Sequence, residues 1–156
     1  MVGLTRQHEA RFSVNAAPEE LWRFIRDFES LCSCIPGVEK LSRIDECTAQ
    51  LTVKEMVGAV PLRVALTARV DAEDPPRALH AVATANHLDI EIDVLLQRIV
   101  SGTELTAVFQ VVGRGPLKPV VDRLFERRAS ERAAQFAESL AARFGREASL
   151  DGRLQP

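Results

Sequence analysis

The chain has 156 residues, which is enough for one domain with a core of its own. Apolar residues make up 46% of it and charged residues 27%, a composition that excludes a disordered chain. A formal net charge of −2 argues against a protein that mainly grips phosphate backbones, because nucleic-acid-binding domains usually carry a strong basic excess. We expect one domain over residues 1–145, a loose tail over residues 146–156, and no nucleic-acid partner.

The apolar runs and the cysteines bear on the compartment. No stretch approaches the roughly 18 to 20 continuous apolar residues of a spanning helix, and the N-terminus lacks the apolar core of a secretion signal. Cys32, Cys34 and Cys47 make an odd count and predict reduced thiols rather than a disulfide framework. We expect a cytoplasmic protein, with at most a peripheral contact at the inner face of the membrane.

The first part of the chain predicts a strand, a helix and a turn. Residues 10–14 carry Phe12 and Val14 at strand spacing, and Pro18 suits the first turn of a helix because its missing N–H has no helical partner there. Four apolar residues then follow at helical spacing: Leu21, Phe24, Ile25 and Phe28. The helix cannot run through residues 35–37, where proline followed by glycine favours a reversal of the chain.

Alternating side chains in the middle of the chain predict a series of strands. They cover residues 38–44, 48–56, 61–71, 79–85, 88–100 and 103–112. Residues 73–76 are expected to form a turn or loop, and the pair Ser101-Gly102 suits a tight hairpin. After a break at residues 113–116, apolar residues at steps of three or four predict a long amphipathic helix to about Phe144.

The middle of this long helix has an unusual composition. Small Ala129 and Ala133 stand beside Arg128 and Arg132, where a tightly packed helix would more often carry leucine. We expect a gap or a polar contact beneath them. The order of strand, helix, several strands and long helix resembles the helix-grip fold of the START and Bet v 1-like superfamily, which implies an α+β domain with a curved antiparallel sheet of about six or seven strands around the C-terminal helix.

A more specific resemblance rests on residues 34–37, whose sequence Cys-Ile-Pro-Gly follows the first predicted helix. Together with residues 12–14, 17–22, 53–54 and 102–105, this turn resembles the carbon monoxide dehydrogenase CoxG family. The resemblance implies non-enzymatic binding of a hydrophobic small molecule, of the quinone or lipid class, with no other cofactor. It also implies a role accessory to a carbon monoxide dehydrogenase or similar molybdenum hydroxylase at the membrane.

A ligand cavity would lie between the apolar strand faces and the small central residues of the long helix. Its predicted lining is Leu51, Val53, Val64, Leu66, Val94, Phe109, Val121, Leu124, Phe125, Arg128, Ala129 and Ala133. The same residues would fill a closed core equally well, because a sequence does not show concavity. Trp22 is predicted to pack in the core rather than to contact a ligand.

Basic residues along the C-terminal helix predict a surface for anionic lipid or for an acidic partner protein. They are Arg114, Lys118, Arg123, Arg127 and Arg132. Asp122, Glu126 and Glu131 interleave with them at pairing distances, so a solvated face with ordinary i,i+4 ion pairs is the alternative.

Other chemistry has weaker support. The three cysteines match no common closed zinc site, so no metal is predicted, and no nucleophile-elbow motif accompanies the histidines. The leading hypothesis is a carrier of an apolar molecule that serves an oxidoreductase. The alternatives are a protein-docking or assembly factor with a filled core and, third, a small cyclase-type enzyme in which His80 and Arg128 would be the candidate acid or base.

Overall fold

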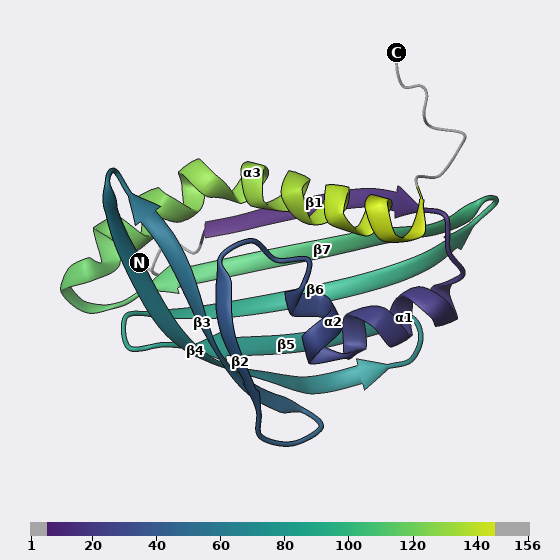
Figure 1. The fold of residues 1–156 in the computed structure, drawn as a ribbon, viewed down its shortest axis with the longest axis horizontal. Coiled ribbons are helices and arrows are strands. Elements are labelled where there is room, and N and C mark those ends of the chain that lie inside the picture. Colours follow the sequence, from purple (N-terminus) through teal and green to yellow (C-terminus); the bar gives the residue numbers. More distant parts are fainter. Residues whose placement is uncertain (1–5, 146–156) are drawn as a thin grey trace, which may run out of the picture.

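A seven-stranded antiparallel sheet is the main layer of the computed structural model, which describes residues 6–145 (Figure 1). The strand order is β1-β7-β6-β5-β4-β3-β2, so β1 and β2 are edges and the sheet is open. The strands are β1 (Arg6–Val14), β2 (Val38–Arg43), β3 (Thr48–Val57), β4 (Val60–Asp74), β5 (Ala78–Thr84), β6 (Leu88–Ile99) and β7 (Gly102–Gly113). The predicted tail, residues 146–156, lies outside the described residues.

Helices cover one face of the sheet, which we term the inner face. The 27-residue α3 (Lys118–Phe144), roughly 40 Å long, follows the 3-10 turn η1 (Gly115–Leu117) and packs on β1 and β7. The shorter α1 (Pro18–Arg26) and α2 (Phe28–Cys32) close one end, while β2 and β3 cross in front of β5–β7 (Figure 1). The arrangement confirms the predicted α+β helix-grip fold. Among the described residues, no helix has the length and apolar character to cross a bilayer.

The first helical region is two helices rather than one. Asp27 has extended backbone angles (φ −92°, ψ 118°) and ends α1. Its carboxylate accepts hydrogen bonds from the backbone N–H of Ser30 (3.0 Å) and from the Ser30 hydroxyl (2.7 Å), and these bonds lower the pKa of Asp27. Asp27 therefore caps α2, and the apolar stripe continues across the break to the buried Phe28.

β4 is longer than predicted. The expected turn over residues 73–76 begins later, because Glu73 and Asp74 still pair with Leu79 and Ala78 of β5. The reversal occurs at residues 75–77, where the backbone N–H of Arg77 donates to the Asp74 carbonyl (2.8 Å). The 15-residue strand pairs with β3 through its first part and with β5 through its second. This bend brings β3 and β2 around toward α3 (Figure 1).

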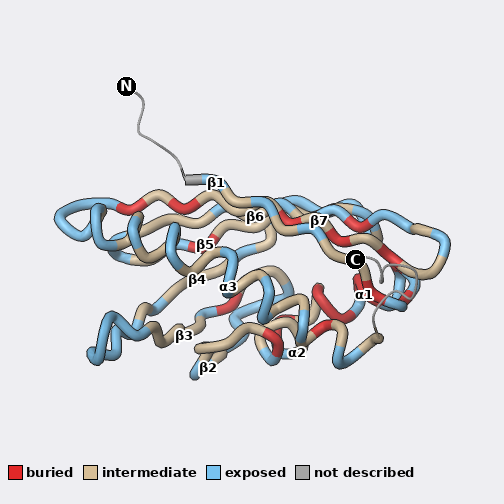
Figure 2. The backbone as a smooth tube through the Cα atoms, turned by 90° about the horizontal axis from the view of Figure 1, so that it is seen from above, coloured by how far each residue is buried: buried red, intermediate tan, exposed pale blue. Residues whose placement is uncertain are grey.

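The fully buried core gathers around α1 (Figure 2). Its members include Val14, Leu21, Trp22 and Leu105, and Leu140 of α3 is completely buried among them. Further buried members are Ala16, Phe24, Ile25, Cys34, Leu96 and Ala107. Trp22 is thus a packing residue, as predicted.

Candidate functional site

Four apolar residues predicted for the cavity occupy the inner face of β3 and β4. Leu51 lies opposite Leu66, and Val53 lies opposite Val64. They share the side-chain parity of Ala49, which is completely buried. All four remain half-buried and none belongs to the core cluster. This part of the inner face is therefore apolar but not closed by packing.

The other two predicted strand residues lie nearer the core. Val94 of β6 and Phe109 of β7 are partly buried and pack against the core cluster. They stand on the same inner face and form a border between the core and the half-buried strands. The structure thus brings all six predicted strand residues to one face.

The two halves of α3 are packed differently. In the C-terminal half, Phe136 meets Phe12 edge to face with ring centroids 6.0 Å apart, and Phe144 meets Phe24 at 5.3 Å. The predicted cavity residues of the N-terminal half and the middle all stay half-buried: Val121, Leu124, Phe125, Arg128, Ala129 and Ala133. Ala129 and Ala133 follow Phe125 at steps of four, so they share one stripe of the helix. Small side chains there keep the helix from filling the space it faces.

A polar contact lies beside these alanines, as one of the two predicted arrangements. Arg132 donates to the carboxylate of Glu55 on β3 and to the carbonyl oxygen of Pro36. Arg128 lies 3.6 Å from the same carboxylate, from Nε to Oε2, and also pairs with Glu131 at 3.1 Å. The Glu55 side chain is only 18% exposed, so its charge is matched where water is scarce. These contacts join α3 to the β2–β3 arm.

The Cys-Ile-Pro-Gly turn is part of this junction. Gly37 has φ +92°, and its carbonyl accepts from the backbone N–H of Lys54 at 2.7 Å. A cavity of about 290 Å³ lies between this turn, β3 and α3. Its lining is mostly polar: Pro36, Gly37, Val38, Glu39, Lys54, Glu55, Met56, Arg128, Arg132 and Gln135.

A second depression, of about 540 Å³, lies across β2, β3 and β4. It is lined by Lys40, Leu41, Ser42, Gln50, Leu51, Thr52, Ala65, Leu66 and Thr67. Since neighbouring side chains on a strand point to opposite faces, only its three leucines belong to the inner face. This depression is not the predicted cavity, although the two share Leu51 and Leu66.

The predicted basic surface divides into three parts. Arg123 and Arg127 are exposed and form no ion pair within the described residues. Arg114 pairs with Asp89 (3.3 Å) and Lys118 with Asp122 (3.1 Å), while Arg132 turns inward to Glu55. The structure therefore leaves two of the five cations as an open basic face.

The two residues considered for catalysis are not brought together. His80 follows the core-packed Leu79 on β5, so it points to the outer face, where its Nδ1 lies 2.6 Å from Asp71 Oδ1. That hydrogen bond raises the pKa of His80. Arg128 lies on α3, across the sheet.

The thiols and the acids form no metal centre within residues 6–145. Cys34 is buried in the core cluster, and burial raises the pKa of Cys32. Cys47 accepts a hydrogen bond from Arg26 (3.5 Å), which also pairs with Glu73.

A family model for the carbon monoxide dehydrogenase protein CoxG matches residues 11–145. The match covers the inner face, the turn at Gly37 and α3. The chain belongs to the carbon monoxide dehydrogenase CoxG family. Among curated proteins, none matches this sequence.

Solved structures share the fold of this CoxG-family chain. A conserved protein from Geobacillus kaustophilus is 19% identical, with TM-score 0.73 over 90% of this chain and 94% of that one. A START superfamily protein from Mycobacterium smegmatis is 18% identical (TM-score 0.66; 91% and 97% covered). The Zhui aromatase/cyclase from Streptomyces sp. R1128 is 14% identical (TM-score 0.63; 88% and 95% covered). At these identities the likeness shows the START-like fold alone.

Sequence reasoning missed Glu55, the acidic partner in this CoxG-family chain. The available signal was its parity: Glu55 shares a strand face with Leu51 and Val53, and a carboxylate on an apolar face requires a partner. Arg128 and Arg132 were both singled out, but nothing in the sequence connects α3 to β3. Their distance along the chain hides the contact.

Proposed function

We propose that this protein is a non-enzymatic carrier that holds a hydrophobic small molecule between the inner face of its sheet and α3. One observation carries the proposal. The apolar side chains of β3, β4 and the N-terminal half of α3 face inward yet stay half-buried, whereas the core around α1 is closed. Covering such surface with an apolar ligand is favourable, at about 25 cal/mol for each Å² removed from water.

The chemistry of this inner region supports a mainly apolar ligand. Side chains on the inner face of β3 and β4 are aliphatic up to Glu55, and the carboxylate of Glu55 is already neutralised by Arg128 and Arg132. An apolar body with few polar atoms, such as a quinone or a lipid, would suit this lining. His80 lies on the other face of the sheet, which gives the cyclase hypothesis no shared site with Arg128.

Family membership supports a second part of the proposal. We place the carrier beside a carbon monoxide dehydrogenase or related molybdenum hydroxylase, where a bound quinone or lipid would serve the oxidoreductase at the membrane. The exposed Arg123 and Arg127 on α3 offer charges to an acidic surface of such a partner.

Native mass spectrometry of the purified protein, followed by organic extraction, tests the ligand directly. We expect retained apolar mass, or binding after incubation with a short-chain quinone or a fatty acid. Ala133→Leu should raise the dissociation constant by about tenfold or more, because overpacking of the space costs about 1–3 kcal/mol. Ala134→Leu is the matched control, since Ala134 is exposed on the same helix.

The outcomes separate the carrier from a docking factor. A clean protein mass, unchanged by quinones and lipids, would contradict the carrier and favour a protein-docking role. Equal weakening by Ala133→Leu and Ala134→Leu would place the ligand away from the inner stripe of α3. Both variants should keep the circular dichroism spectrum of the parent protein.

A further inference from the structure

The hairpin between β3 and β4 ends in an apolar tip, residues 56–62. Its sequence is Met-Val-Gly-Ala-Val-Pro-Leu, without a charged or hydrogen-bonding side chain. All seven residues are exposed, and Val60 is 64% exposed. Met56, Val57 and Leu62 each expose more than a third of their surface. Large apolar residues gathered at one exposed turn mark a contact site rather than chance exposure.

The backbone presents this tip as a tight, ordered turn. Val57 pairs with Val60 and Met56 with Pro61, so Gly58 and Ala59 form a two-residue loop. Gly58 has φ +64°, the conformation that glycine adopts at the first central position of a type II′ turn. Figure 1 shows this turn at the edge of the molecule, away from the end that carries α1. The tip is therefore a fixed projection.

Both faces of the hairpin are apolar, and this distinguishes the occupant. Met56 and Pro61 point to one face of the sheet, while Val57, Val60 and Leu62 point to the other. A protein surface that covered one face would leave the other in water. A bilayer interface surrounds an inserted turn on all sides, so it can bury both faces at once.

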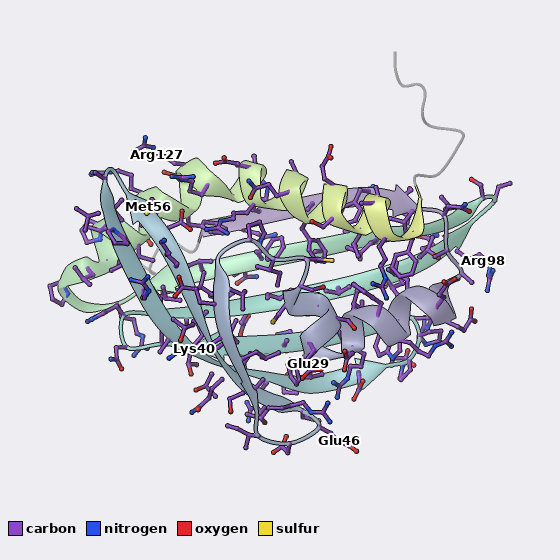
Figure 3. All side chains as sticks on the ribbon, in the orientation of Figure 1. Glu29, Lys40, Glu46, Met56, Arg98 and Arg127 are labelled. Carbon is purple, nitrogen blue, oxygen red and sulfur yellow. The ribbon has the colours of Figure 1, made fainter. Side chains whose placement is uncertain are left out.

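Cations stand directly behind the apolar tip. Lys54 and Arg63 lie opposite each other on neighbouring strands, although like charges in that position repel. Arg63 is paired with Glu39 (2.9 Å), whereas Lys54 forms no ion pair within residues 6–145. On the α3 side, Met56 shares a cavity wall with Arg128 and Arg132, and the exposed Arg127 lies at the same end of the molecule (Figure 3). An apolar tip with cations behind it matches an anionic lipid surface, acyl chains first and phosphates next.

We propose that the 56–62 tip inserts into the interface of an anionic lipid bilayer and docks the protein there, with Lys54 and Arg127 against the head groups. The docking goes beyond the proposed carrier function, because it requires no ligand in the inner region. It also places the lipid contact on the β3–β4 hairpin, with α3 contributing charge beside it.

Vesicle co-sedimentation with no added ligand tests this docking. We compare vesicles of phosphatidylcholine alone with vesicles of equal parts phosphatidylcholine and phosphatidylglycerol. The parent protein should bind the anionic vesicles more tightly, and added salt should weaken that binding. Val60→Glu should lower the partition coefficient by about tenfold or more, since it removes an inserted aliphatic group and adds a charge that anionic lipid repels.

Val100→Glu is the matched control. Val100 is a fully exposed valine in the β6–β7 turn, away from the hairpin tip, so its replacement should leave partitioning within about twofold. Val60→Ser serves as a second, uncharged variant and should also weaken binding. The proposal is overturned if the parent protein stays in the supernatant with both vesicles, or if Val60→Glu sediments as the parent does. A parent protein that binds quinone but neither kind of vesicle would overturn the docking and spare the carrier.

Discussion

Arg132 of α3 and Glu55 of β3 form the ion pair that joins the long helix to the β2–β3 arm. The same guanidinium donates to the Pro36 carbonyl, so one side chain holds both a strand and the turn that precedes β2. Because Arg132 is 27% exposed and Glu55 18%, the pair is screened less than a surface ion pair. It closes the side of the inner region that α3 does not cover with apolar contacts.

Removal of Arg132 should therefore loosen the arm. We expect Arg132→Ala to lower the free energy of unfolding by about 1–2 kcal/mol, as Glu55 and the Pro36 carbonyl each lose a donor and partial exposure reduces the effect. Urea denaturation measures the change. Arg127→Ala, on the exposed side of α3, should stay within about 0.5 kcal/mol. Equal effects of the two substitutions would show that the contact adds no stability.

Gly37 predicts a larger penalty on substitution than Gly58. Both have positive φ, but a Cβ on Gly37 would lie 2.7 Å from the Lys54 carbonyl oxygen, while one on Gly58 would meet nothing within 4 Å. Gly58→Ala should cost about 1 kcal/mol from backbone strain alone. Gly37→Ala should cost clearly more, about 2–3 kcal/mol, because the turn must also shift from β3. Thermal unfolding of the two variants compares them, and similar losses would contradict the close approach.

Local patterns in the sequence were sufficient to predict the element order. Proline and glycine at residues 36–37 mark the turn before β2, and the steps of three and four from residue 117 mark α3. The extension of β4 to Asp74 was missed because strand pairing with Ala78 overrides the turn preference of acidic residues and proline. The break at Asp27 was missed because the apolar stripe is continuous across it. Tertiary pairing and a single cap decided these details.

The candidate site was predictable only in part. Alternation placed Leu51, Val53, Val64 and Leu66 on one face, since strand parity is a local property. Whether that face is filled depends on the separation of α3 from β3, which no local pattern encodes. The Arg132–Glu55 contact spans 77 residues of sequence, and the exposure of the 56–62 tip depends on where neighbouring elements end. Distances between elements are set by the whole fold.

His80 should make stability depend on pH. Its hydrogen bond to Asp71, with Asp93 and Glu91 also nearby, raises its pKa above the usual value of about 6.5. The protonated form is favoured in the folded state, so this stabilisation is fully present below about pH 6.5 and is lost as the pH rises through the higher folded pKa. The stability difference between the parent protein and His80→Gln should therefore shrink from about pH 6 to about pH 8.

Denaturation series at several pH values measure this difference. Asp71→Asn should remove most of the same dependence, because it removes the main cause of the shift. His87→Gln is the control, as His87 lies exposed in the turn between β5 and β6. A gap between the parent and His80→Gln that stays constant or widens with rising pH would refute the assignment.

Thr103 is the buried polar residue of the core, and it should tolerate an isosteric change poorly. Its hydroxyl donates to the Ala16 carbonyl at 2.7 Å, and the side chain is 0% exposed. Thr103→Val keeps the shape but leaves that carbonyl without its donor next to α1, which should cost about 1–3 kcal/mol in the free energy of unfolding. Thr106→Val, on the outer face of the same strand, should change it by no more than about 0.5 kcal/mol. If chemical denaturation gives the two variants the same midpoint, the hydrogen bond does not hold the junction of β1 and α1 to β7, and the apolar contacts of Leu21 and Leu105 alone secure that end of the core.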